Sequence, residues 1–83
     1  MAPPPPLDDL RRFVARILRC DVAVLQDDTD LLATGLLDSL QVVELATELE
    51  RGWGILLDAW DLTPENFASV GALRCMLDAK LAA

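Results

Sequence analysis

The chain is short, apolar and acidic: of its 83 residues, 53% are apolar and 5% aromatic, and the net charge is −7. A chain of this length has room for one hydrophobic core and therefore for one domain, and its Leu/Ala/Val-rich balance favours packed helices over a β-sandwich. The acidic surface disfavours binding to nucleic acid or to anionic lipid.

No apolar run approaches the roughly 18 residues of a membrane-spanning helix. The N-terminus also lacks the basic and apolar regions of a secretory signal. We therefore expect a cytoplasmic protein with no membrane span. We also expect a monomer.

Residue types that support independent chemistry are scarce. The sequence has no histidine, which removes the commonest general base and the commonest metal ligand. Cys20 and Cys75 fit no metal or redox spacing and lie beside apolar helical positions, so we expect reduced, partly buried thiols. An acidic cluster at residues 27–30 lacks the glycine and distal glutamate of a calcium loop. We predict no catalytic residue and no metal site.

The chain begins with a proline run. Residues 1–6 are predicted to be a disordered, proline-rich leader, with a motif for a proline-reading domain as the alternative. Residues 7–82 are predicted to form the single folded domain. A first helix is expected from Leu7 to about Cys20, because apolar residues recur on one face at three- and four-residue spacing. That face contains Leu7, Leu10, Val14, Ile17 and Leu18.

A long connection over residues 21–38 follows, and its many aliphatic residues predict a segment held against the core. A second helix is expected from Ser39 to Arg51 or Gly52. Asp38 is a favoured N-cap, and Gln41 lies three positions later, as a capping box requires.

The remainder of the chain predicts two more helices. Glycine around Trp53 ends the second helix, and Trp53 itself is expected in the core. Thr63 and Pro64 are a favourable start for a short third helix that reaches Ala68. Ser69 is expected to cap a final long helix. The predicted fold is all-α: a four-helix bundle with three long helices, one short third helix and a long first loop.

Ser39 at the first position of the second helix lies near the positive end of the helix dipole, where a phosphate ester is stabilised. The run Asp38-Ser39-Leu40, with Val43-Glu44-Leu45 after it, resembles the modification site of the acyl and peptidyl carrier proteins. In that family the serine is esterified by 4′-phosphopantetheine, whose thiol carries acyl or aminoacyl groups. The resemblance extends over most of residues 7–82. It implies that Ser39 is an attachment point, flanked by the motif residues Asp38 and Leu40, in a carrier that is not an enzyme.

The resemblance also implies where partner enzymes dock. In carrier proteins the second helix is the main recognition element, which points to Leu40, Val43, Glu44 and Glu48. From the residues alone, the acidic side of this helix, formed by Glu44, Glu48 and Glu50, is more often a solvated face than a docking surface. Trp60 is either an exposed interface residue near the arm or a lid over the small core.

The implied partners are a phosphopantetheinyl transferase, a ligase that loads an acyl or aminoacyl group, and downstream transferases or synthases. The form Gly-Leu-Leu-Asp-Ser at residues 35–39 resembles stand-alone carriers of specialised pathways: polyketide, nonribosomal peptide or D-alanyl. The alternative is a small acidic helical domain that binds other proteins without a covalent cofactor. A hydrolase that uses Ser39 lacks a base.

Overall fold

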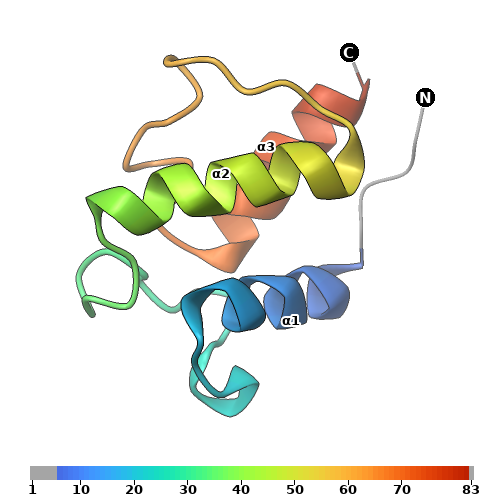
Figure 1. The fold of residues 1–83 in the computed structure, drawn as a ribbon. Coiled ribbons are helices and arrows are strands. Elements are labelled where there is room, and N and C mark those ends of the chain that lie inside the picture. The colour runs from blue at the N-terminus through green and yellow to red at the C-terminus, as the bar shows by residue number, and fades with distance from the viewer. Residues whose placement is uncertain (1–5, 83) are drawn as a thin grey trace.

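The computed structural model describes residues 6–82, and the predicted leader at residues 1–6 lies almost wholly outside this range. Three α-helices, α1 (Leu7–Leu18), α2 (Ser39–Trp53) and α3 (Val70–Ala82), are joined by two long connections, the first of which contains a short 3₁₀ helix, η1 (Val22–Val24). Helices α1 and α2 run antiparallel, and α3 lies behind α2 in Figure 1. Because the described residues contain no strand, the predicted all-α class is confirmed.

Helix α1 contributes one face to the core. Leu10 and Val14 are fully buried there, whereas Leu7 and Ile17 are half-buried at its margin. The helix ends at Leu18, slightly before the predicted end. Arg19 adopts a left-handed conformation with φ 57°, and the Cys20 amide donates to the Ala15 carbonyl at 3.0 Å, which closes the helix.

The first connection is part of the core, as its aliphatic residues predict. Leu25, Leu31 and Leu37 are buried. The Leu31 amide donates to the Ala68 carbonyl at 2.7 Å, so this connection is tied to the segment that leads into α3. The result is a fixed path for the backbone up to the start of α2.

The predicted short helix over residues 63–68 is wrong, because the segment forms turns only. A single helix-like hydrogen bond joins the Phe67 amide to the Thr63 carbonyl at 3.2 Å. The first turn of a helix orders several residues for one hydrogen bond, and this segment is too short to add further turns. Phe67 nevertheless anchors the segment, since its ring is buried. Ser69 caps α3 as expected by accepting the Ala72 amide at 3.1 Å.

The two cysteines differ in exposure. Cys20 is half-buried, but the prediction of partial burial is wrong for Cys75, which is exposed. Helix α3 buries Leu73 and Leu77, and a residue two positions after Leu73 points to the opposite side of a helix. Both thiols are free.

Trp53 lies at the C-terminus of α2, half-buried, with its ring edge-on to Phe13 of α1 at a centroid distance of 4.8 Å. Gly52 lies against the Phe13 ring, where a Cβ atom would already be in van der Waals contact at 3.5 Å. Gly54 caps the helix in a left-handed conformation, φ 65°, as predicted. Trp53 thus closes the α1–α2 interface at the end of α2 remote from Ser39.

An ion pair that the sequence did not predict ties the second connection, residues 54–69, to α3. Lys80 Nζ lies 2.7 Å from Asp61 Oδ2, and both side chains are largely shielded from solvent. The Lys80 hydrogen bond is the main cause that lowers the pKa of Asp61, and the same bond raises the pKa of Lys80. The second connection is therefore held at two points: at Asp61 by this pair, and at Leu57, whose amide donates to the Glu50 carboxylate of α2 at 2.8 Å.

Candidate functional site: the start of helix α2 and an adjoining groove

The start of α2 is fixed by a reciprocal pair of hydrogen bonds. Asp38 Oδ1 accepts the Gln41 amide at 2.8 Å, and Gln41 Oε1 accepts the Asp38 amide at 3.0 Å. The predicted capping box is therefore present. Gly35, with φ 78°, lies just before it in a left-handed turn that favours glycine. Local sequence thus determines where the helix begins, and Ser39 is its first residue.

Ser39 is exposed at this end of α2. Among residues 6–82, no side chain hydrogen-bonds to its hydroxyl, and the chain has no histidine to deprotonate it. Amides in the first turn of a helix lack partners within the helix, so a phosphate ester at this position is stabilised by them and by the dipole. A phosphopantetheine group attached here fits the site, because the oxygen is accessible and its surroundings favour an anion.

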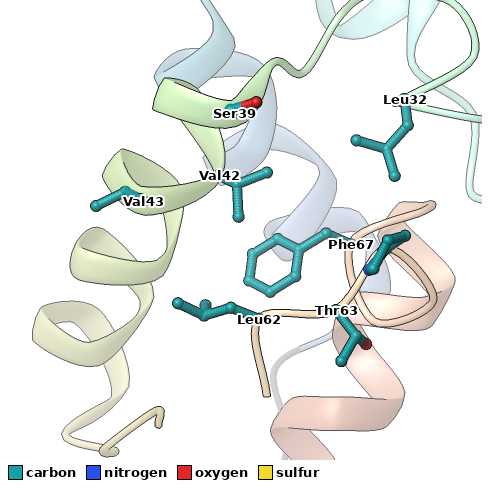
Figure 2. Close-up of a pocket in the computed structure, with 8 residues that line it drawn as sticks. Leu32, Ser39, Val42, Val43, Leu62, Thr63 and Phe67 are labelled. Carbon is teal, nitrogen blue, oxygen red and sulfur yellow. The ribbon is translucent and has the colours of Figure 1, made fainter. Parts of the chain in front are cut away.

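An apolar groove with a volume of about 360 Å³ adjoins Ser39 (Figure 2). Ser39 lies at one end, and Val42 and Phe67 face each other further along it. Apart from Ser39 and Thr63, every side chain in the lining is apolar. The full lining is Leu32, Ser39, Val42, Val43, Leu62, Thr63, Pro64 and Phe67.

The groove is not evident in the sequence. Leu32 comes from the first connection, Val42 from α2, and Leu62 and Pro64 from the second connection. Each was readable as an apolar residue, but no local pattern shows that three separate segments meet beside Ser39. Only the folded chain brings them together.

The residues proposed for docking lie at the surface, with different degrees of exposure. Leu40 is 82% exposed and Val43 57% exposed, and Glu44 is exposed beside them. Glu48 is half-buried and lies 3.3 Å from Arg51 in an ion pair. Trp60 is 87% exposed, so of the two alternatives the structure excludes a lid over the core.

The structure brings only some of these residues together. Val43 shares the groove lining with Ser39, whereas Trp60 is absent from that lining and belongs to the second connection. Glu50 differs from the expected exposed acid, since it is half-buried and accepts the Leu57 amide. The acidic surface of α2 is therefore narrower than the sequence suggests.

Metal sites and membrane-spanning helices were also sought in the described part of the chain. No group of three or more potential metal ligands occurs among residues 6–82. Within the same residues, no helix has the length and apolar character needed to cross a membrane.

A family model described as "Phosphopantetheine attachment site" matches residues 8–73, most of the chain. The chain belongs to this family of carrier domains. A carrier domain is not a catalytic enzyme, and it bears a covalently attached 4′-phosphopantetheine group.

The chain is also similar to polyketide-8 synthase acyl carrier protein 2 of Streptomyces avermitilis, with 38% identity over 56 residues. The alignment covers 68% of this chain and 64% of the relative. The matching family and this relative are both carrier proteins, so the resemblance to carrier proteins and the phosphopantetheine cofactor that it implies are confirmed.

Proposed function

We propose that this chain is a stand-alone acyl carrier protein whose 4′-phosphopantetheine arm is attached to Ser39, and that it serves a specialised pathway of the polyketide type. The observation that carries the proposal is an exposed hydroxyl at the capped start of α2, directly beside an apolar groove. The arm supplies a terminal thiol that holds the acyl group as a thioester.

The residues around Ser39 support an attachment point rather than a nucleophile of an active site. The capping box of Asp38 and Gln41 fixes the backbone, so that the hydroxyl is presented at a constant position. The chain has no histidine, and its one lysine, Lys80, is paired with Asp61, so the proton of Ser39 must be removed by an external enzyme. We infer that a phosphopantetheinyl transferase supplies that base together with Mg²⁺.

The groove favours an acyl cargo over an aminoacyl cargo. Its side chains are aliphatic or aromatic except for two hydroxyls, and none is acidic. The ammonium of an aminoacyl group would lose hydration there without gaining a counter-ion, which costs free energy. An aliphatic chain gains about 0.8 kcal/mol for each methylene that leaves water. The printed name of the relative, a polyketide synthase carrier, agrees with an acyl cargo.

Docking residues on α2 complete the proposal. Leu40 and Val43 offer apolar contact next to Ser39, while Glu44 and Glu48 add negative charge on the same helix. A net charge of −7 attracts partners with basic surfaces, which raises the association rate and makes docking sensitive to salt. These partners are an acyl-loading ligase and downstream transferases or synthases. The monomeric state and the cytoplasmic location stay predictions.

The test is an intact-mass measurement after incubation with coenzyme A, Mg²⁺ and a promiscuous phosphopantetheinyl transferase. We expect one phosphopantetheine on the wild-type chain and none on Ser39→Ala. Thr47→Ala is the matched control, because it removes another exposed hydroxyl from the same helix and should be modified like wild type. A wild-type chain that several transferases leave unmodified would instead support an interaction domain without a cofactor.

Cargo type is tested on chains loaded enzymatically with a butyryl or an alanyl arm. The methyl signals of Val42 and the ring signals of Phe67 should move with the butyryl arm and stay in place with the alanyl arm. Equal shifts with both arms, or none with either, would contradict a preference of the groove for acyl groups.

A further inference from the structure

Trp60 is the most exposed large apolar side chain among the described residues, at 87%. An indole left in water contributes nothing to the core, and tryptophan is among the residues most often found to dominate the binding energy of protein interfaces. The exposure of Trp60 is therefore better explained by contact with a partner protein than by a role in the fold.

The backbone that carries Trp60 is held by a compact set of hydrogen bonds. Asp58 Oδ1 accepts the Trp60 amide at 2.8 Å and the Asp61 amide at 3.2 Å, and Asp61 Oδ2 accepts the Asp58 amide at 3.0 Å. The Asp61 carboxylate is in turn paired with Lys80, and the Asp61 carbonyl accepts Asn66 Nδ2 at 2.9 Å. A side chain displayed on a turn fixed in this way loses little backbone entropy when a partner binds it.

The turn that carries Trp60 adjoins the groove that contains Ser39. Leu62 lines the same groove as Ser39, and Trp60 is two residues away, so its Cα lies within about 7 Å of the Leu62 Cα. A standard interface buries about 800 Å² on each partner, equivalent to a disc of about 16 Å radius. A protein with an interface of this size centred on Ser39 covers the groove and extends toward the turn that carries Trp60.

We propose that Trp60 is an apolar anchor for the phosphopantetheinyl transferase, in addition to the contacts on α2. This inference rests on the proposed modification of Ser39. The transferase is the partner whose active site must seat on Ser39 itself. Asp58 lies exposed two residues from the indole, and the chain is strongly acidic. The surface that fits is therefore an apolar cleft for the indole with lysine or arginine at its rim.

The test compares steady-state kinetics of a promiscuous transferase on wild-type chain and on Trp60→Ala. We expect KM for the chain to rise about tenfold, equivalent to about 1.4 kcal/mol, with kcat unchanged. Val24→Ala is the control, because Val24 is also an exposed apolar residue, 57%, but lies on η1, far from the second connection in Figure 1. It should leave KM unchanged.

A second measurement reports contact directly. The wild-type chain is produced with 5-fluorotryptophan, and its two fluorine signals are followed while unlabelled transferase is added without coenzyme A. The Trp60 signal should shift and broaden, and the half-buried Trp53 should change less. An unchanged KM for Trp60→Ala, or a Trp60 signal that does not move at saturating transferase, overturns the proposal for Trp60. The proposed function still stands in that case if the wild-type chain is modified. If the wild-type chain is never modified, both the proposed function and the proposal for Trp60 are refuted.

Discussion

Replacing Asp38 by alanine tests whether the capping box sets the start of α2. The variant loses the hydrogen bond of 2.8 Å that Asp38 Oδ1 accepts from the Gln41 amide. The backbone amide of residue 38 can still donate to Gln41 Oε1, but the first bond no longer holds the two residues in place. Both groups are at least partly exposed, so water replaces part of what is lost. Loss of an N-cap typically costs about 1 kcal/mol, within a range of about 0.5–2. For a domain of this size that corresponds to a fall in Tm of about 4–8 °C.

The assay is thermal unfolding followed by circular dichroism. Asp38→Ser should recover most of the lost Tm, because a serine oxygen can also accept the amide. Asp28→Ala removes another exposed aspartate, one with no side-chain hydrogen bond, and should change the free energy of unfolding by less than about 0.5 kcal/mol. If Asp38→Ala unfolds at the wild-type temperature, or Asp38→Ser does no better than alanine, the cap does not stabilise this helix start.

Two further predictions concern the connections. Leu31→Ala should lower the free energy of unfolding by about 2–5 kcal/mol in urea titrations, because Leu31 is fully buried. Leu40→Ala truncates an exposed leucine and should change the free energy of unfolding little. Equal effects of the two substitutions would mean that the first connection is not part of the core. Lys80→Met should be less stable than wild type at neutral pH. Because pairing lowers the pKa of Asp61 and raises that of Lys80, the difference in Tm should shrink as the pH falls below 3.8 and as it rises above 10.5. A difference that is constant across this pH range would show that the ion pair does not contribute to stability.

Short-range signals in the sequence predicted much of the site. The Asp38–Gln41 capping box, the left-handed Gly54 and the apolar stripe of α1 each depend on residues within one or two helical turns, and each is present. The family motif overlaps the cap, because Asp38, the N-cap of α2, directly precedes Ser39.

Part of what the sequence did not predict depends on residues that are distant in the chain. The Asp61–Lys80 pair and the groove join segments that only folding brings together, and neither leaves a local pattern. The turn over residues 63–68 carries good helix-start residues but is too short for cooperative helix formation. Cys75 shows that an apolar neighbourhood in sequence does not determine which face of a helix a residue occupies.

Locating the arm by mass spectrometry is the most direct test of the central claim. Wild-type chain treated with transferase and coenzyme A is fragmented, and the position that carries the added phosphopantetheine is read from the fragment masses. A single modified position at Ser39 is the predicted result. Modification at Ser69 or at any threonine, or a treated chain that stays bare, would contradict the assignment of Ser39 as the attachment point.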